Sequence, residues 1–154
     1  SAYVVNGSEV GSDKFEYKKA WLDGLLKDCE AWLAQYPNLA LVGDYNIAPD
    51  DRDVHDPKAW EGQVLCSPEE RSRFNTLLGM GLVDSFRLFE QPEKTYSWWD
   101  YRMLGFQKNK GLRIDHVLLS KPLAQRCTAS VIDRAPRKWE KPSDHAPAVA
   151  TLSV

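Results

Sequence analysis

The order of apolar and polar positions along the chain predicts a layered α/β domain. Residues 3–5, Tyr-Val-Val, have the composition of a strand. Apolar residues then recur at helical spacing between residues 15 and 33, after Ser12 or Asp13 as the helix cap. The apolar run at residues 39–42 predicts a buried strand. A strand, a helix and a strand in succession are typical of layered α/β proteins.

The remainder of the chain predicts a second helix and further strands. Residues 47–62 are rich in Asp and Pro and show no periodicity, which indicates a loop. Ser67, Pro68 and Glu70 form a helix-start signal, so we expect a helix from there to about Leu78. Strands are expected at residues 95–99, 112–119, 131–132 and 146–152. We therefore expect an α/β fold with mostly one mixed or antiparallel sheet and helices on one face, whose other face a second layer must cover.

The composition fits one globular domain that is not exported. The 154 residues are 43% hydrophobic, which suffices for a sizeable core. The three cysteines have no paired spacing, which argues against a disulfide framework and against a cysteine-based zinc site. No segment has the length and apolarity of a membrane span or of a secretory leader. A reducing cytoplasm is the expected setting.

Charge is distributed unevenly along the chain. The net charge is −2, but residues 102–141 hold ten Lys or Arg against three acidic residues, a net charge of +7. The remainder therefore carries −9. An acidic body with one basic stretch suits a protein that holds a divalent metal in one place and meets phosphates beside it. A solvated charged face is the alternative explanation.

A carboxylate and a carboxamide follow the strand at residues 39–42, in Gly43-Asp44-Tyr45-Asn46. Residues two positions apart in a strand point the same way, so we expect Asp44 and Asn46 to share one face at the strand tip. A protein core gains nothing from two such groups, whereas a hydrolytic site needs fixed ligands for a hard cation, a water or a phosphate.

Asp115 lies in an apolar strand and needs a cation or a donor. One explanation is an ion pair with Arg113 on the same face, and the other is that Asp115 orients a histidine. That histidine is available as His145, directly after Asp144 and before a strand. A carboxylate on one ring nitrogen would fix the tautomer of His145 and keep it positively charged. His116 faces the opposite side of the strand and is expected to be an interior side chain.

Trp98 and Trp99 stand beside the basic stretch. Alternation along a strand favours one buried and one exposed tryptophan. Core packing explains most tryptophans, but an exposed one here could stack on nucleotides.

Five motifs, in their order along the chain, resemble those of the exonuclease III family of abasic-site endonucleases, within the larger endonuclease/exonuclease/phosphatase superfamily. They are Tyr3 with Asn6, Gly43-Asp44-Tyr45-Asn46-Ile47-Ala48-Pro49, Trp98-Trp99-Asp100-Tyr101-Arg102, Gly111-Leu112-Arg113-Ile114-Asp115 and Lys141-Pro142-Ser143-Asp144-His145-Ala146-Pro147. The resemblance implies the four-layer α/β sandwich of deoxyribonuclease I-like enzymes. Residues 1–154 would be the C-terminal portion of a single catalytic domain whose N-terminal half, with one sheet and a metal-binding Glu, is absent. That missing half, or a second copy, would cover the sheet.

The resemblance also implies a role for each matching residue. Asp44 would align the attacking water and take its proton, while Asn46 would help to place water, phosphate or metal. Asp115 would orient His145 against the phosphate oxygens, with His145 acting as a base or as an electrostatic stabiliser. A Mg²⁺ or Mn²⁺ ion would be held by Asp44, Asn46, Asp144 and His145 together with the missing Glu. The expected substrate contacts are Tyr3, as a catalytic residue at the scissile phosphate, Asn6 near the phosphodiester, Trp98 beside the base-free sugar, and Arg102 and Arg113 on the DNA backbone.

The function implied by the resemblance is metal-dependent hydrolysis of DNA phosphodiesters in base excision repair. The full-length parent would cleave double-stranded DNA on the 5′ side of abasic sites and would act on 3′ ends as a 3′-to-5′ exonuclease and 3′-phosphatase. The isolated chain would be weak or inactive. Two alternatives are the same chemistry on a lipid or small phosphoester, and a non-catalytic piece that binds DNA or its missing half.

Overall fold

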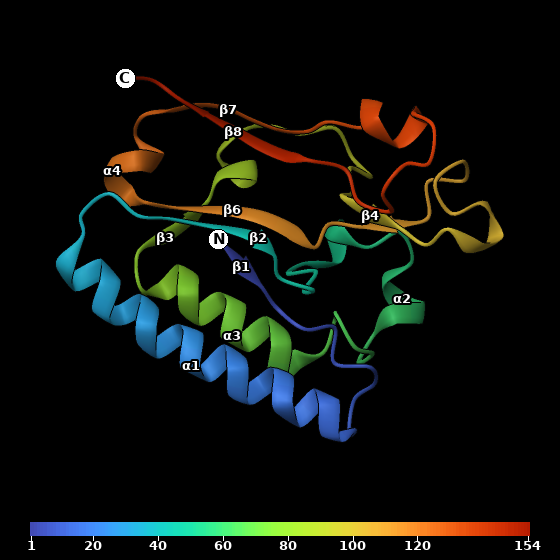
Figure 1. The fold of residues 1–154 in the computed structure, drawn as a ribbon, viewed down its shortest axis with the longest axis horizontal. Coiled ribbons are helices and arrows are strands. Elements are labelled where there is room, and N and C mark those ends of the chain that lie inside the picture. Colours follow the sequence, from blue (N-terminus) through green and yellow to red (C-terminus); the bar gives the residue numbers. More distant parts are fainter.

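A computed structural model describes residues 1–154, and its centre is a four-stranded mixed sheet in the order β1-β2-β6-β3. The strands are β1 (Ala2–Tyr3), β2 (Ala40–Asp44), β6 (Asp115–Ser120) and β3 (Leu82–Asp84). Strand β1 runs parallel to β2, whereas β6 is antiparallel to both β2 and β3. The two long helices cover one face of this sheet (Figure 1). The predicted α/β class, with a mixed sheet and helices on one face, is confirmed.

Local signals explain where the long helices begin. Helix α1 (Asp13–Gln35) starts at Ser12, whose side chain accepts a hydrogen bond from the Phe15 N–H at 3.1 Å. Helix α3 (Pro68–Gly79) starts at a complete capping box, in which Ser67 and Glu70 satisfy each other's backbone N–H groups. Both helices pack their apolar faces on the sheet and form its main core, which includes Leu22, Leu25, Cys29, Leu41, Phe74, Leu77 and Leu118.

The other face of the sheet is covered in part by the C-terminal hairpin (Figure 1). Strands β7 (Cys127–Ile132) and β8 (Ala148–Leu152) pair only with each other, as a separate antiparallel sheet. The expectation that these strands extend the main sheet is wrong. Short helix α4 (Lys121–Ala124) follows β6 and turns the chain out of the plane of the sheet, so that β7 returns above it.

The predicted strand at residues 112–119 is two strands in the structure. Strand β5 (Gly111–Leu112) pairs with β4 (Trp98–Trp99), and β6 begins only at Asp115. Between them, the Arg113 side chain points into a buried ion pair, and the N–H groups of Ile114 and Asp115 both donate to the Ser97 hydroxyl, at 2.9 and 3.1 Å. The strand expected at residues 95–99 is reduced to Trp98–Trp99.

Several short elements complete the chain. The segment expected to be a loop at residues 47–62 contains a 3₁₀ turn at Asp51–Asp53 and helix α2 (Pro57–Trp60). Further 3₁₀ turns lie at Ser85–Leu88, Arg102–Leu104 and Ala135–Lys138. The strand expected from residue 146 begins at Ala148, after Pro147, which has no N–H to contribute to a ladder. No helix in the structure has the length and apolarity needed to cross a membrane.

Candidate active site

Asp44 and Asp115 face each other across two neighbouring strands. They are register partners in the β2–β6 ladder, and each side chain is only 16% exposed. Directly opposed residues of an antiparallel pair lie close enough for like charges to repel. Burial raises the pKa of Asp44 to about 6, and the neighbouring Asp115 charge adds to this effect. The two carboxylates therefore need a cation between them.

His145 supplies a positive group at this position. Its Nδ1 lies 2.8 Å from Asp115 Oδ2, while its Nε2 lies 3.8 Å from Asp44 Oδ2 and 3.9 Å from Asp144 Oδ1. Burial works against the imidazolium, but the hydrogen bond to Asp115 and the three carboxylate charges outweigh it and raise the pKa of His145. Of the two explanations for Asp115, the structure has the one in which it orients a histidine.

The segment around His145 is fixed by β4 and its neighbours. The Ala146 N–H donates to the Ser97 carbonyl at 2.7 Å, and the Trp99 N–H donates to the Asp144 carbonyl at 3.1 Å. The Trp98 indole N–H donates to Asp144 Oδ2 at 3.0 Å. Trp99 is fully buried and Trp98 half-buried, as alternation along the strand predicts. Trp98 thus lies beside the cluster and holds one oxygen of Asp144.

Asn46 reaches the site by a different route from the one predicted. Strand β2 ends at Asp44, and Asn46 has the left-handed φ of 48°, so the two-residue strand repeat does not apply. Its N–H donates to Asp44 Oδ1 at 2.9 Å, and its Nδ2 donates to the Val4 carbonyl at 2.7 Å. The remaining amide oxygen of Asn46 accepts no hydrogen bond from the protein. A tight turn therefore binds the Asn46 backbone to the Asp44 carboxylate and leaves one acceptor of the Asn46 side chain free.

Three other predicted substrate contacts are accessible. Tyr3 is the register partner of Asp44 in the β1–β2 ladder and is 65% exposed. Asn6 is exposed, and its Oδ1 accepts the Ser8 N–H at 3.1 Å. Arg102 is exposed, but its guanidinium already pairs with Asp100 at 2.7 Å. Tyr3 thus lies next to the carboxylates, while Arg102 meets a substrate only in competition with Asp100.

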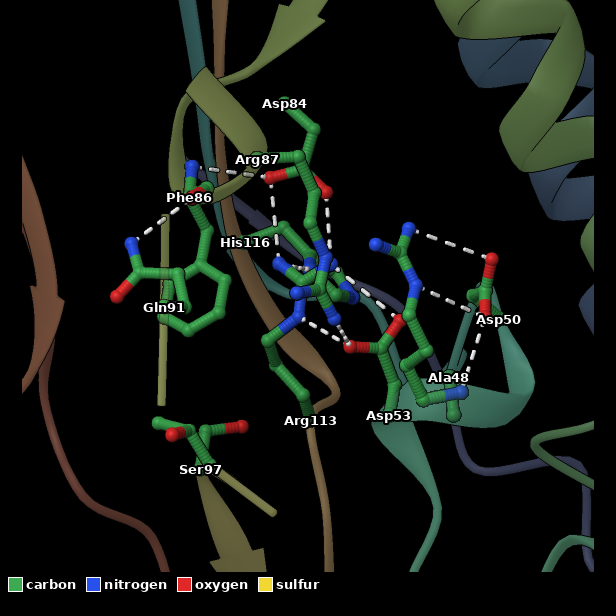
Figure 2. A network of polar contacts seen from close by, with 12 residues as sticks. Ala48, Asp50, Asp53, Asp84, Phe86, Arg87, Gln91, Ser97, Arg113 and His116 are labelled. Carbon is green, nitrogen blue, oxygen red and sulfur yellow. Dashed lines mark hydrogen bonds and ion pairs between the residues drawn. The ribbon is translucent and has the colours of Figure 1, made fainter. Parts of the chain in front are cut away.

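Arg113 is the site prediction that the structure contradicts. Its side chain is 1% exposed and lies between two carboxylates, with Nε 2.7 Å from Asp53 Oδ1 and Nη2 2.7 Å from Asp84 Oδ2 (Figure 2). His116 Nδ1 lies 3.2 Å from its Nη1 and His116 Nε2 lies 2.8 Å from the Ile47 carbonyl, which makes His116 an interior side chain, as predicted. Arg113 cannot contact DNA because every direction open to its guanidinium is already occupied.

Two interior residues next to the site were missed by the sequence analysis. Lys18 of α1 is fully buried and donates to the carbonyl of Asn46. The signal was present, because Lys18 interrupts the apolar stripe of Phe15, Leu22 and Leu25 at the position where an apolar residue belongs. Ser97, which binds the backbone on both sides of the Asp115–His145 contact, gave no such signal.

The cluster has the chemistry of a divalent-metal site. Ligand atoms of Asp44, Asp115 and His145 all lie within 4.8 Å of one another, on the wall of a cavity of about 490 Å³. Asp144, half-buried beside them, adds a third carboxylate. Three carboxylates against one imidazolium leave a net negative charge, and carboxylate oxygens are the ligands that hard divalent cations prefer. The residues present therefore fit a divalent ion.

Known proteins similar to this chain include several nucleases. Residues 3–145 match the model of the Endonuclease/Exonuclease/phosphatase family, whose members depend on divalent metals. Exodeoxyribonuclease III of Haemophilus influenzae is 40% identical over 157 residues, which cover 94% of this chain and 59% of that protein. DNA repair nuclease APEX1 of Danio rerio is 36% identical over 159 residues, covering 100% of this chain and 48% of that protein. The chain therefore spans between about half and three fifths of these relatives.

Solved structures share the fold. A variant of the 3′ phosphatase NExo from Neisseria, bound to a product DNA hairpin, has a TM-score of 0.97 and 40% identity, covering 99% of this chain and 60% of that one. An AP endonuclease from Archaeoglobus fulgidus has a TM-score of 0.93 and 35% identity, with the same coverage. These matches confirm the deoxyribonuclease I-like fold and the resemblance drawn from the five motifs. Since the family model matches residues 3–145, nearly the full length, the chain belongs to the endonuclease/exonuclease/phosphatase family.

Proposed function

We propose that the protein to which this chain belongs is a DNA repair nuclease that hydrolyses phosphodiesters with the help of a divalent metal. Its substrates would be double-stranded DNA cleaved on the 5′ side of abasic sites, and 3′ ends from which nucleotides or phosphates are removed. The observation that carries the proposal is the cluster of Asp44, Asp115 and His145, in which an opposed pair of carboxylates is bridged by an imidazole. The names of the relatives supply the substrate class.

Asp44 is the proposed base that takes a proton from the attacking water. A general base works best with a pKa near the operating pH, and the pKa of about 6 for Asp44 leaves it ionised at neutral pH yet basic enough to accept a proton. The Asn46 N–H holds one carboxylate oxygen of Asp44 at 2.9 Å, so the other is free to face the water.

His145 is the proposed electrostatic partner of the phosphate. Asp115 fixes its ring through Nδ1, which leaves the Nε2–H pointing to the space between Asp44 and Asp144. A fixed N–H donor beside a phosphate oxygen stabilises the charge that develops during hydrolysis. We assign His145 to the phosphate rather than to the metal, because an imidazolium has no lone pair to give to a metal.

The remaining oxygen donors are proposed to hold the cation. They are one oxygen of Asp44, the free oxygen of Asp144 and the amide oxygen of Asn46, together with groups from outside this chain. Mg²⁺ or Mn²⁺ held there would supply charge neutralisation at the phosphate. Tyr3 and Asn6 would bind the phosphodiester from the β1 side, and Trp98 would face the sugar.

The basic stretch now favours DNA as the substrate. Of its ten basic residues, Arg113 and Arg137 are buried. Six of the exposed ones lie on the loops next to β4, β5 and the 3₁₀ turn at Ala135–Lys138: Arg102, Lys108, Lys110, Arg134, Lys138 and Lys141. Asp44 ends β2 and Asp115 begins β6, and this end of the two strands lies toward β4 in Figure 1. A positive rim beside a metal site suits a long polyanion, whereas a lipid headgroup or a small phosphoester needs no such rim.

The relatives are longer than this chain, so the test of the proposal also uses a longer protein. We propose that this chain is the C-terminal portion of one catalytic domain, and its three free cysteines are consistent with a cytoplasmic protein. The assay therefore compares the 154-residue chain with a fusion in which the N-terminal part of Haemophilus influenzae exodeoxyribonuclease III precedes it. Substrates are an abasic duplex, a duplex with a 3′-phosphate and an inositol phosphate, each with Mg²⁺ or EDTA.

We expect the fusion to cut the abasic duplex in Mg²⁺ and the isolated chain to be weak or inactive. Asp44→Asn in the fusion should slow cleavage by about 10²–10⁴-fold, the usual contribution of a general base. The proposal fails if the fusion leaves the abasic duplex intact, or if Asp44→Asn cuts as fast as the parent. Faster turnover of the inositol phosphate would favour the phosphatase alternative.

A further inference from the structure

Lys18 brings together three segments that are distant in the sequence. It lies on the buried face of α1, and its Nζ donates to the Asn6 carbonyl at 3.0 Å, to the Asn46 carbonyl at 2.6 Å and to the Glu70 carboxylate. An ammonium group has three N–H donors, so this one is fully used by protein groups. The proposed mechanism uses none of these contacts, yet two of the three partners are residues of the proposed site.

Glu70 holds Lys18 in a fixed place. It is also fully buried, and its carboxylate accepts the Leu65 N–H at 3.0 Å, the Ser67 hydroxyl at 2.8 Å and the Ser67 N–H at 3.4 Å. These bonds belong to the start of α3, which packs beside α1 (Figure 1). The ammonium position is therefore set by the two long helices and not by the loops that it binds.

The two loops are each bound to this ammonium through a backbone carbonyl. Asn46 is left-handed, and its carbonyl is bound by Lys18 while its side chain binds the Val4 carbonyl. In the other loop, Asn6 is followed by Gly7 with a φ of 93°, and a Cβ on Gly7 would lie 3.0 Å from the Lys18 side chain. Each loop thus places an asparagine whose amide retains one group free for a ligand: Nδ2 of Asn6 and Oδ1 of Asn46.

Stability alone does not account for this arrangement. Replacing a fully buried ion pair by apolar groups of similar volume is often neutral or stabilising, because two charges are removed from the interior together. Burial also lowers the pKa of Lys18, although Glu70 and Asp44 oppose that shift. What an apolar pair cannot reproduce is the link between the two carbonyl groups.

We propose that Lys18 is a positioning residue that sets the placement of Asn6 relative to Asn46, and thereby the geometry with which the site receives a phosphodiester. This inference rests on the proposed function for the identity of the ligand. Its structural part, that Lys18 orders the two loops, is independent of that function.

The test separates loop ordering from the cost of an unpaired charge. Lys18→Met leaves Glu70 buried without a cation, so the decisive protein is the double variant Lys18→Met with Glu70→Gln. In it a neutral amide oxygen in the place of Oε1 can still accept the Ser67 hydroxyl and the Ser67 N–H at the start of α3. Lys19→Met is the matched control, since Lys19 is the next residue and its partner Glu16 is exposed. Each 154-residue variant is compared by thermal unfolding and by amide hydrogen exchange without metal or DNA.

We expect the double variant to unfold near the wild-type temperature, but with faster amide hydrogen exchange in the two loops. The N–H groups of Asn46 and Ser8, which donate to Asp44 Oδ1 and Asn6 Oδ1, should exchange about tenfold faster or more. The Tyr45 N–H, held by the Ile114 carbonyl at 3.0 Å, should keep its protection. In the fusion, kcat/KM should fall about 10²-fold, the usual effect of misplacing a substrate by about 1 Å.

The proposal is overturned if the double variant recovers wild-type exchange at both amides, since Lys18 would then be only one half of a charge pair. It is also overturned if the double variant does not fold, since the pair would then be needed for stability itself. A wild-type fusion that cleaves no phosphoester would refute the proposed function, while the exchange measurements would still decide whether Lys18 orders the loops.

Discussion

Replacing Arg113 by methionine should cost far more stability than replacing a surface arginine with the same type of partner. Methionine keeps much of the volume and removes the guanidinium. Asp53 would retain Arg87, whose Nη2 lies 2.5 Å from Asp53 Oδ1. Asp84, only 9% exposed, would lose both of its Arg113 bonds, at 2.7 and 3.2 Å, and keep only the Phe86 N–H at 3.3 Å.

The size of the loss in the free energy of unfolding follows from the Asp84 carboxylate, which is left without its cation. Removing one partner of a buried ion pair costs about 3–5 kcal/mol, because the other charge remains in the interior. The total free energy of unfolding of a small domain is about 5–15 kcal/mol, so the variant should unfold at a much lower urea concentration. Adding Asp84→Asn to Arg113→Met should recover part of the loss.

The pH dependence gives a second signature. In the unmodified chain, the charge of Arg113 outweighs the effect of burial and holds the pKa of Asp84 below its usual value. The ion pair therefore stabilises the fold at neutral pH, and this stabilisation is lost as the pH falls through the lowered pKa. Without Arg113, burial alone raises the pKa of Asp84, so ionised Asp84 destabilises the variant as the pH rises above about 4. The difference in the free energy of unfolding between the unmodified chain and Arg113→Met should therefore become smaller as the pH is lowered from about 7.5 to about 5.

The control is Arg73→Met. Arg73 also makes a two-pronged pair with an aspartate, Asp23, at 2.9 and 3.3 Å, but the Asp23 side chain is 57% exposed. Exposed pairs are worth about 0.2–1 kcal/mol. Urea unfolding followed by tryptophan fluorescence at both pH values measures all the variants. Asp84 is not left as an unpaired buried charge if Arg113→Met lowers the free energy of unfolding no more than Arg73→Met does, or if the loss is the same at both pH values.

Three further outcomes are expected. Asp44→Asn should stabilise the chain by about 1–3 kcal/mol at about pH 7.5, because a folded-state pKa raised to about 6 means that ionised Asp44 opposes folding. Thermal unfolding checks this, and a destabilised variant would contradict it. Cleavage by the fusion should fall below about pH 6 as Asp44 gains a proton, and again above the raised pKa of His145, so that His145→Gln loses the alkaline limb of the rate profile. Mg²⁺ should raise the unfolding temperature of the unmodified chain, and Asp144→Asn should remove this rise; an equal rise in that variant would exclude Asp144 as a ligand. EDTA should abolish cleavage by the fusion.

The fold is predictable from the sequence where local chemistry decides it. The capping residues before α1 and α3 mark both helix starts, and the apolar run before Gly43 marks β2. Within the site, the Asp115–His145 contact and the alternation of Trp98 and Trp99 can be foreseen, because each follows from a strand tip or a strand face.

The rest depends on partners that no local pattern names. Arg113 resembles a DNA contact because it is a cation within a recognised motif, but its partner Asp53 lies in a segment without periodicity, 60 positions earlier. For Asn46 the predicted reason is wrong, since a left-handed turn replaces the strand geometry on which the prediction relies, and its contact with Asp44 is made by the backbone N–H. The C-terminal hairpin leaves the main sheet because the path of the chain after β6 depends on tertiary packing.

The pairing of Asp44 with Asp115 also has a kinetic consequence for folding. About 70 residues of chain separate these two partners in the β2–β6 ladder, so the carboxylates meet only after a long loop has closed. Contacts of such high sequence separation are slow to form, and the helices can form earlier because their contacts are local. A partly folded chain would therefore have its helices before Asp44, Asp115 and His145 come together. Any metal affinity of this cluster would then appear only once the sheet is complete.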